Sequence, residues 1–332
     1  MTNAILSRLH LPLFATAFAA ISLTAVAADP VVIVTQPKDR RVTDQTPVTL
    51  TVKADGTEPV TYQWFRNGTA IAGATADKLE LPKVTFADSG AKFHVVVKNE
   101  ADGKPASVTS TNATLTVVTP GSALTHRYSF AKDASDSVGN ANGTLEGAAA
   151  INNGKVVLDG QRGTFVNLPG GLIAGNTAVT FEFWADLGVN RNWARVFDQG
   201  STNGNNGGHD LYFSPRRGQN YGITIMDPHP RERVITARGN LDNSTNLHVA
   251  CVLDPSSGFM GFYTNGVLVA STNGLTSFAS VDTNWFFLGK SLFGGDPALN
   301  GSIDEFRVYN VGLSADAVAA SYKAGPNAEI KK

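Results

Sequence analysis

Short runs of alternating apolar and polar residues, separated by turn-forming pairs, make up most of the chain. The run 262–264 (Phe-Tyr-Thr) is followed by Asn265-Gly266 and then by the apolar run 267–269. Asn-Gly between two such runs favours a type I′ turn, so we predict a β-hairpin here. The overall pattern predicts an all-β protein whose antiparallel strands are joined by tight turns. Further Asn-Gly pairs begin at Asn67, Asn142, Asn273 and Asn300.

One stretch near the end of the chain has a helical pattern. Ser314 can cap a short helix that runs through Tyr322, with Asp316 in its first turn and Gly325 beyond its end. Serine at the N-cap, an acid in the first turn and glycine after the last turn all favour a helix with these ends. We therefore predict a short C-terminal helix on an otherwise all-β chain.

The apolar residues before this helix are out of phase with one another. Phe306 and Val308 alternate as one buried face of a strand, but Ile303 is offset from them by one residue. Because strand side chains alternate with a period of two, the offset predicts a β-bulge at Asp304-Glu305. The bulge would bring two carboxylates together at the rim of a sheet.

The first residues have the pattern of an export signal. Arg8 precedes an apolar run from Leu11 to Val26, and Ala25-Val26-Ala27 resembles a cleavage site. We predict that residues 1–27 are a signal peptide and that the protein is exported to the periplasm, the cell surface or the extracellular space. No later run is long and apolar enough to span a bilayer.

The net charge limits the kinds of partner that the protein can bind, and the cysteine content limits the interactions that can stabilise it. The chain has 27 Lys and Arg against 28 Asp and Glu, a net charge of −1, which argues against nucleic acid as a partner. Cys251 is the only cysteine, so no intramolecular disulfide can form. Cys251 shares a strand face with Val249 and Leu253, which indicates a core position.

In the segment 29–118, a strand at 61–66 carries Trp64, and the stretch Asp88-Ser89-Gly90-Ala91-Lys92-Phe93-His94-Val95 comes later. The segment resembles an immunoglobulin-like module, in which this stretch occupies the place of the family's Asp-x-Gly-x-Tyr-x-Cys. Val52 and Val95 stand where the family has its two cysteines, and Phe93 replaces the corner tyrosine. The resemblance implies a β-sandwich held by packing around Trp64, and residues 119–123 read as a linker.

The segment 124–327 carries a series of short motifs in a fixed order. The motifs are 124–130 (LTHRYSF), 136–139 (DSVG), 142–145 (NGTL), 157–160 (VLDG), 179–184 (VTFEFW), 193–200 (WARVFDQG), 287–291 (FLGKS) and 303–309 (IDEFRVY). In this order they resemble the laminin G-like, concanavalin A-like jelly rolls, and the resemblance implies a second, two-sheet β-sandwich.

This superfamily includes glycoside hydrolases, so a catalytic carboxylate pair is the first chemistry to seek. The nearest match to Glu-x-Asp-x-Glu is 182–186, in which Trp184 replaces the central acid. Glu182 and Asp186 stand four residues apart on a strand, more than twice the about 5 Å that a retaining pair needs. We interpret Glu182 as a structural hydrogen-bond acceptor and predict that the protein is not an enzyme.

A calcium site is the second candidate. Asp136 and Asn142 lie in an oxygen-rich loop, and the first and last strands of this architecture lie close together, which could bring Asp304 to that loop. Calcium takes six to eight oxygen ligands. The alternative is that Asp and Asn simply make the turns. A calcium ion here would be structural, and no other cofactor is indicated.

The third candidate is a ligand-binding surface between 193 and 238. Aromatic faces can stack on sugars, and arginines can hydrogen-bond hydroxyls or acidic groups. The alternative is a solvated rim of loops. Arg195 and Asp198 fit an internal ion pair, and Trp285 fits packing. The candidate residues are Trp193, Tyr212, Arg216, Arg217, Tyr221, Arg231 and Arg233.

These features together favour an exported, non-catalytic binding protein. It would recognise an extracellular carbohydrate or a cell-surface protein through loops of the second module, with the first module as a spacer. Two alternatives stay open: a structural or adhesion component that binds proteins through a sheet face or edge, and a glycoside hydrolase with an unrecognised site.

Overall fold

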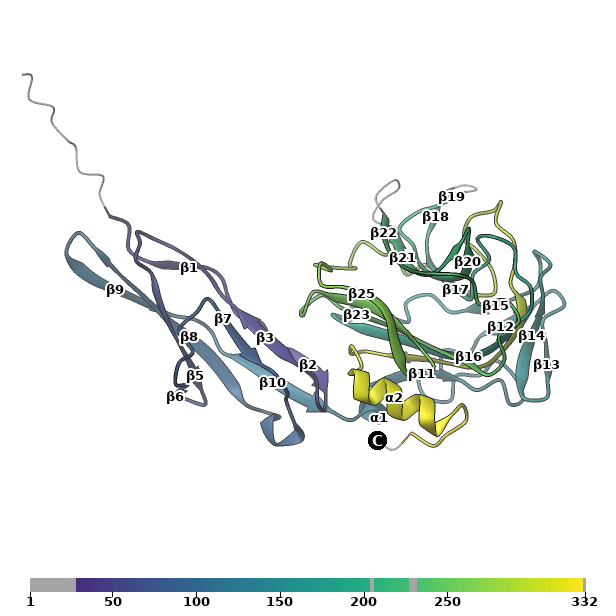
Figure 1. Ribbon diagram of the computed structural model, residues 1–332, viewed down its shortest axis with the longest axis horizontal. Helices are drawn as coiled ribbons and strands as arrows, with labels where there is room; N and C mark the ends of the chain where they lie inside the picture. Colours follow the sequence, from purple (N-terminus) through teal and green to yellow (C-terminus); the bar gives the residue numbers. More distant parts are fainter. Residues whose placement is uncertain (1–27, 204–205, 227–231, 331–332) are drawn as a thin grey trace, which may run out of the picture.

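Two β-sandwiches follow one another along the chain. The computed structural model describes residues 28–203, 206–226 and 232–330, and the predicted signal segment 1–27 lies outside them. Figure 1 shows an elongated first sandwich beside a rounder second one. The prediction of an all-β protein is confirmed.

The first sandwich pairs its strands in the immunoglobulin-like manner. One sheet has the order β2-β10-β8-β5-β6, with β9 on β8, and the facing layer consists of the pairs β3-β7 and β1-β4. Strand β2 runs parallel to β10, and the other pairs are antiparallel. The elements are β1 Val32–Thr35, β2 Arg40–Thr43, β3 Val48–Thr51, β4 Lys53–Asp55, β5 Thr61–Arg66, β6 Thr69–Ala70, β7 Lys78–Leu81, the 3₁₀ turn η1 Phe86–Asp88, β8 Lys92–Ala101, β9 Lys104–Thr109 and β10 Ala113–Val118.

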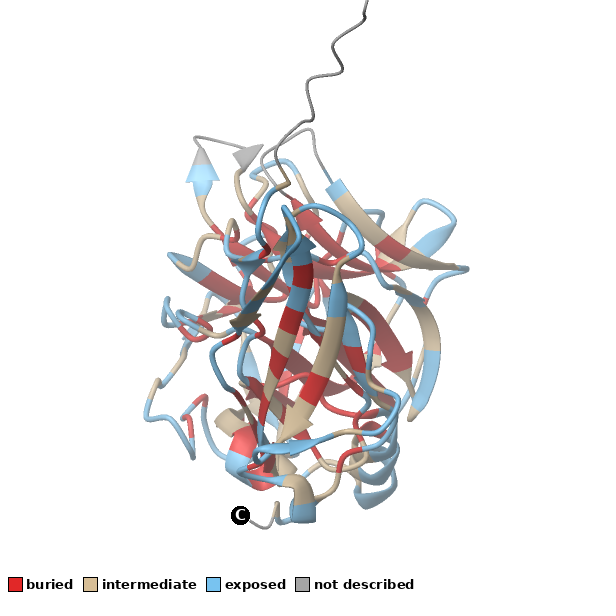
Figure 2. Ribbon diagram, turned by 90° about the vertical axis from the view of Figure 1, so that its left-hand side faces the viewer, coloured by how far each residue is buried: buried red, intermediate tan, exposed pale blue. Residues whose placement is uncertain are grey.

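Trp64 is the centre of the first core. Its side chain is fully buried, and its Nε1 donates a hydrogen bond to the Ala76 carbonyl at 2.9 Å. Val52 and Val95 both belong to the same buried cluster, so a hydrophobic contact replaces the family's disulfide as predicted. Figure 2 shows this core as buried segments alternating with exposed ones along the strands nearest the viewer.

The predicted linker is a short helix. Residues Pro120–Ala123 form α1, and the Thr119 hydroxyl accepts the backbone N–H of Ser122 at 3.1 Å as its cap. Ala123 is buried in a cluster with residues of the second sandwich. The segment connects the last strand of the first sandwich to the first strand of the second, and the sequence pattern of Pro, Gly and Ser gave no sign of its helical form or packing.

The second sandwich consists of two facing sheets. The large sheet has the order β13-β14-β27-β16-β23-β24-β25 with β11 on β27, and the small sheet has the order β12-β15-β26-β17-β20-β21-β22. The strands are β11 Leu124–Tyr128, β12 Thr144–Glu146, β13 Ala150–Asn152, β14 Lys155–Asp159, β15 Phe165–Leu168, β16 Val179–Leu187, β17 Phe197–Gly200, β18 Thr202–Asn203, β19 Asn206–Gly207, β20 Leu211–Arg217, β21 Asn220–Met226, β22 Glu232–Arg238, β23 Leu247–Asp254, β24 Phe259–Thr264, β25 Val267–Thr272, β26 Trp285–Leu288 and β27 Asn300–Tyr309.

Phenylalanines from both sheets fill the space between them. The ring of Phe181 lies 4.8 Å from that of Phe197, and the ring of Phe197 lies 5.8 Å from that of Phe306. Cys251 is fully buried in the same cluster, as predicted. The core therefore holds the two sheets face to face without a disulfide.

The predicted hairpin and bulge are both present. Strands β24 and β25 are joined by Asn265 and Gly266, whose φ angles are 48° and 78°. In the pairing of β16 with β27, Trp184 lies opposite Glu305 and Ala185 opposite Ile303, so Asp304 is the extra residue of a bulge.

Helix α2, Ala315–Ala324, lies against the outer face of the large sheet (Figure 1). The Ser314 hydroxyl accepts the backbone N–H of Ala317 at 3.2 Å, and Gly325 ends the helix with a φ of 83°. The predicted cap and the glycine beyond the helix are confirmed, and the helix extends past the predicted Tyr322 to Ala324. The outer face of the small sheet is on the opposite side of the sandwich.

Beneath α2 the large sheet carries a buried ionic network. Glu182 is fully buried and accepts hydrogen bonds from His248 Nε2 at 2.9 Å, Tyr309 Oη at 2.8 Å and Arg307 Nη1 at 3.2 Å. The interpretation of Glu182 as a structural acceptor is confirmed. Among the residues that the structure describes, no helix is long and apolar enough to cross a bilayer.

Candidate functional site

The outer face of the small sheet carries polar and aromatic side chains. Phe197 and Phe213 point into the core, so their neighbours Asp198 and Tyr212 point outward. We call the outward side of β17, β20, β21 and β26 the small-sheet outer face. It is formed by Asp198, Asp210, Tyr212, Thr224, Trp285 and Phe287.

Arg195 covers the middle of this face. Its guanidinium lies 3.7 Å from the centroid of the Tyr212 ring, and its Nε lies 3.6 Å from an Asp198 carboxylate oxygen. Its Nη2 donates a hydrogen bond to Asp296 at 3.1 Å. The internal ion pair of Arg195 with Asp198 is confirmed. Tyr212 is only 1% exposed, so the prediction that it stacks on a ligand is wrong because Arg195 lies over its ring.

Trp193 stands exposed beside this arginine. It is 38% exposed, and the guanidinium groups of Arg217 and Arg195 lie 4.9 Å and 5.7 Å from its ring centroid. Its backbone N–H donates to the Arg216 carbonyl at 2.8 Å, and its own carbonyl accepts from Arg195 Nη1 at 2.6 Å. These contacts to its backbone and its ring hold the exposed indole in a defined position.

The backbone of Trp193 is itself unusual. Its φ is 74°, a left-handed conformation that bulky residues rarely adopt. Such strain persists only where surrounding contacts impose it, and it clusters at ligand-binding sites. The strained backbone therefore marks Trp193 as a candidate site residue.

A second aromatic group lies on strand β26 of the same face. Trp285 is 46% exposed, and its ring lies 6.0 Å from that of Phe287. Lys290 Nζ lies 4.3 Å from the Phe287 ring centroid and 4.1 Å from that of Phe165. The interpretation of Trp285 as a packing residue is corrected, because its strand presents it outward and nothing in the described residues covers it fully.

Two buried carboxylates lie between these aromatic groups. Asp198 and Asp210 are both fully buried, and burial raises the pKa of each; the charge of Asp198 raises the pKa of Asp210 further. Within the described residues, Asp198 Oδ1 and Asp210 Oδ2 have no hydrogen-bond partner. The pair therefore favours a state that retains a proton. No motif in the sequence singled out Asp210.

Of the other predicted ligand residues, only Arg217 has its side chain beside the ring of Trp193 in the described part of the chain. Arg216 binds Asp242 at 2.5 Å, whereas Arg217 joins Trp193 and also pairs with Glu232 at 2.5 Å. The ring of Tyr221 lies 5.6 Å from that of Phe262 and packs against the core. Arg233 lies opposite the core residue Ile225 in the strand register, and Arg231 lies outside the described residues.

The loop residues predicted to bind calcium are engaged with protein donors. The Asp136 carboxylate accepts the backbone N–H groups of Arg127, Val138, Gly139 and Ala141 at 2.9–3.0 Å. It also lies 2.7 Å from His126 Nδ1. The Asn142 side-chain oxygen accepts the backbone N–H of Asp136 at 2.9 Å. These oxygens shape the turn, which is the alternative that the sequence left open.

Asp304 has a different set of partners. Asn327 Nδ2 donates to Asp304 at 3.2 Å, and Lys155 Nζ lies 3.8 Å from its carboxylate. In the described part of the chain, no group of three or more His, Cys, Asp or Glu side chains could hold a metal ion. A calcium site stays a prediction that this geometry does not test.

The carboxylates of the candidate catalytic strand are also separately engaged. Glu182 is enclosed beneath α2, whereas Asp186 pairs with Lys155 at 2.6 Å near the rim of the large sheet. A hydrolase needs two carboxyl groups that reach the same sugar. Glu182 and Asp186 do not form such a pair.

Comparison with known sequences identifies part of the second sandwich. A profile described as the concanavalin A-like lectin/glucanases superfamily, of the laminin G type, matches residues 159–319. Strands β11 and β14, which precede or overlap the start of this match, pair with β27 inside it. No curated protein matches the chain significantly.

Solved structures resemble the second sandwich. Domain 4 of an extracellular arabinanase of glycoside hydrolase family 43 from Geobacillus stearothermophilus, in complex with arabinotriose, matches with 24% identity and a TM-score of 0.46 over 59% of this chain and 97% of its own. The binding domain of botulinum neurotoxin serotype C1 matches with 13% identity and a TM-score of 0.50 over 61% of this chain and 52% of its own. At these identities the toxin domain supports the fold alone.

Proposed function

Because residues 159–319 form a laminin G-like domain of the concanavalin A-like lectin/glucanases superfamily, we propose that this chain is an exported, non-catalytic protein that binds extracellular carbohydrate. The ligand would lie on the small-sheet outer face. The observation that carries the proposal is Trp193, an exposed indole held in a left-handed backbone between two arginines.

The chemistry of this indole suits a sugar. The apolar face of a pyranose or furanose ring packs on an exposed aromatic face, while a neighbouring guanidinium donates hydrogen bonds to hydroxyl groups. Arg217 lies against the Trp193 ring and is itself partly exposed. Trp285, with 46% of its surface exposed, offers a second aromatic contact for a longer chain.

The buried carboxylates support binding rather than hydrolysis. Asp198 and Asp210 lie side by side with raised pKa values, which is a feature of some catalytic pairs. Both are fully buried, so a glycosidic oxygen cannot reach them in this conformation. A catalytic acid must lie within hydrogen-bonding reach of the bond that it cleaves.

A glycan array tests the proposal. The mature chain, labelled at its N-terminus, is applied to neutral and acidic oligosaccharides, and Trp193→Ala is compared with Phe86→Ala. Phe86 is 50% exposed on the first sandwich and serves as the matched control. We expect at least one glycan class to bind the wild type and the control but not Trp193→Ala. Binding that survives Trp193→Ala, or no glycan binding together with capture by a cell-surface protein, contradicts the proposal.

Structural calcium is part of the same proposal. The chain's Asp304, which lies in the bulge between Lys155 and Asn327, is the residue to test. A bound ion raises the melting temperature of the folded state by mass action. We expect calcium to raise the melting temperature and Asp304→Ala to abolish the rise. An equal melting temperature in calcium and in chelator contradicts the proposed calcium site.

A further inference from the structure

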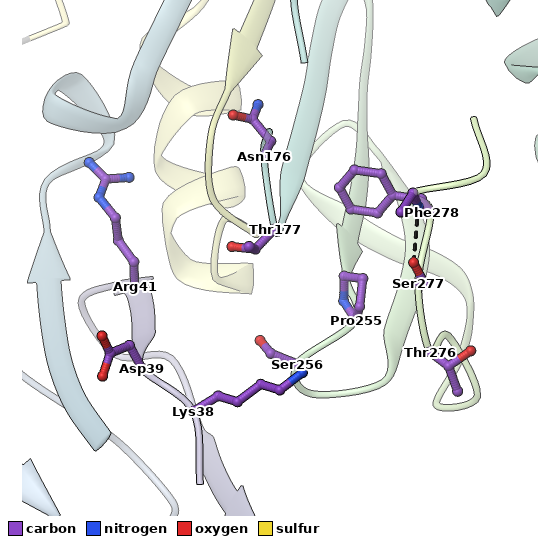
Figure 3. A pocket seen from close by; sticks show the side chains of 11 residues that line it. Lys38, Asp39, Arg41, Asn176, Thr177, Pro255, Ser256, Thr276, Ser277 and Phe278 are labelled. Carbon is purple, nitrogen blue, oxygen red and sulfur yellow. Dashed lines mark hydrogen bonds between the residues drawn. The ribbon is translucent and has the colours of Figure 1, made fainter. Parts of the chain in front are cut away.

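A cleft separates the two sandwiches on one side of their contact. It has a volume of about 310 Å³, at the lower end of the range of about 300–1,000 Å³ typical of small-molecule sites. Figure 3 shows side chains of the first sandwich on one side and side chains of the second sandwich on the other. Residues 38, 39 and 41 line it from the first sandwich, and residues 176–177, 255–256 and 276–279 line it from the second.

The two walls are held together by buried contacts. Arg40 Nη2 binds Asp254 at 3.2 Å, with side-chain exposures of only 2% and 9%. The Thr43 hydroxyl accepts the backbone N–H of Ser314 at 3.0 Å, and the Ser314 hydroxyl donates to the Asp44 carbonyl at 3.1 Å. Because these contacts are enclosed and directional, the cleft has a defined shape before any ligand binds.

The cleft has an excess of positive charge. Lys38 and Arg41 supply two cations, and Asp39 supplies one carboxylate, which already accepts the backbone N–H of Thr114 at 2.7 Å. In the described residues Lys38 makes no ion pair, and Arg41 donates only to neutral acceptors, the side chain of Asn310 at 2.5 Å and the carbonyl of Ser122 at 3.2 Å.

Two further observations indicate that Arg41 lacks a counter-charge. Burial lowers the pKa of Arg41, as expected for a cation moved from water without an anionic partner. The nearby carboxylate of Asp254 is taken up by Arg40 and by the hydroxyls of Ser256 and Ser257. Arg41 therefore has no carboxylate partner among the described residues, and its charge can pair with an anionic ligand.

The wall formed by the second sandwich offers groups that suit a polyhydroxylated ligand. The Asn176 amide nitrogen is buried and has no hydrogen-bond partner among the described residues. Thr177, Ser256 and Thr276 add hydroxyls that can donate or accept, and Phe278 adds an apolar ring to the lining (Figure 3). A buried donor without a partner is costly, so a ligand that accepts from it gains affinity.

From this combination we propose that the cleft is a second ligand site, which binds one uronic acid residue of an acidic saccharide. The carboxylate of the sugar pairs with Lys38 and Arg41, and its ring hydroxyls bind the Asn176 amide and the cleft hydroxyls. This site is separate from the small-sheet outer face and does not depend on the function proposed for Trp193. It gives the contact between the sandwiches a role in recognition.

Calorimetric titration with trigalacturonic acid tests the site. The comparison variants are Lys38→Glu, which reverses the charge, and Asn176→Leu, which removes the donor at similar size. Lys104→Glu is the matched control, since it makes the same charge change in strand β9, away from the cleft (Figure 1). Thermal unfolding of each variant verifies that it is folded.

We expect Lys38→Glu to weaken binding by about tenfold or more, because like-charge repulsion replaces a charge-assisted contact. We expect a smaller loss for Asn176→Leu and no change for Lys104→Glu or Trp193→Ala. Neutral maltotriose should not bind in the cleft. Galacturonic acid that binds as tightly as the trimer identifies a free sugar acid as the ligand, whereas tighter binding of the trimer identifies a polysaccharide chain.

Four results overturn the proposal. The first is the absence of binding by trigalacturonic acid, and the second is equal affinity in the wild type and in folded Lys38→Glu. The third is tighter binding of a triglutamate peptide than of the saccharide. The fourth is a loss of binding in Trp193→Ala alone, which assigns the acidic saccharide to the small-sheet outer face.

Discussion

Removal of the Glu182 carboxylate should strongly destabilise the second sandwich. Glu182 is fully buried and serves as the acceptor for His248, Tyr309 and Arg307 beneath helix α2. In Glu182→Ala the hydroxyl of Tyr309 and the ring of His248 lose this partner, while Arg307 keeps Glu305. Buried donors then face an apolar methyl group in place of a carboxylate.

The expected magnitude follows from the burial. Breaking a buried charged interaction by removing one partner costs about 3–5 kcal/mol. For a domain of this size, 1 kcal/mol shifts the melting temperature by about 2–4 °C. We therefore expect Glu182→Ala to lower the melting temperature of the second sandwich by about 6–20 °C.

The same residue predicts how stability depends on pH. Burial alone would raise the pKa of Glu182, but the hydrogen bond from His248 and the charge of Arg307 outweigh it and lower the pKa. A carboxyl group with a lowered pKa stabilises the folded state above its unfolded pKa of about 4.3. This contribution to stability is lost as the pH falls through the lowered pKa of Glu182 in the folded state, and it is absent in Glu182→Ala.

Differential scanning calorimetry of the whole mature chain measures this effect. Glu80→Ala is the matched control, since that carboxylate is 63% exposed on the first sandwich and pairs with Lys78 at the surface. We expect the control to change the melting temperature little. A fall of less than about 2 °C in Glu182→Ala would show that the network under α2 contributes little to stability, and would refute the reasoning.

Three further predictions concern other buried charges. Asp136→Ala should lower the melting temperature of the second sandwich, because it leaves several turn N–H groups without an acceptor, and an unchanged melting temperature contradicts this. Asp198 has a pKa raised by burial, so wild-type stability should fall as the pH rises from about 4 toward neutral, and Asp198→Asn should reduce that fall in urea titrations. Arg40→Ala should lower stability and loosen the contact between the sandwiches, which calorimetry and small-angle scattering would detect, because it leaves Asp254 without its cation.

The sequence predicted those elements whose formation depends on residues close together in the chain. The Asn265-Gly266 turn, the Ser314 cap and the Asp304 bulge all follow from turn chemistry, capping and strand period, and each is present. The burial of Cys251 followed from strand alternation, and that of Trp64 was implied by the resemblance to an immunoglobulin-like module.

The candidate site depended on contacts between distant segments, which strand period does not reveal. Tyr212 was predicted to stack on a ligand because it lies among arginines and aromatic residues in the sequence, but only the structure shows that Arg195 covers its ring. Trp285 was interpreted as packing because its neighbours are apolar, yet it is exposed at the start of strand β26. The pair of Asp198 with Asp210 arises from the register of β17 against β20, which no single motif encodes.

The helical form of the linker shows the same limit. Pro120-Gly121-Ser122 has the composition of a flexible connection, but Thr119 caps it and Ala123 packs into the second sandwich. Tertiary packing therefore overrides the local preference of this segment.

The most direct test of the central claim is the affinity of the small-sheet outer face for a glycan with and without the indole of Trp193. The glycan is the tightest binder from the array, and isothermal titration compares the wild type with Trp193→Ala and Phe86→Ala. Removal of a stacked aromatic contact worth about 1.5–3 kcal/mol should weaken binding by about tenfold to more than a hundredfold, with no change in the control. Equal affinities in all three proteins would contradict the claim that Trp193 forms the ligand-binding surface.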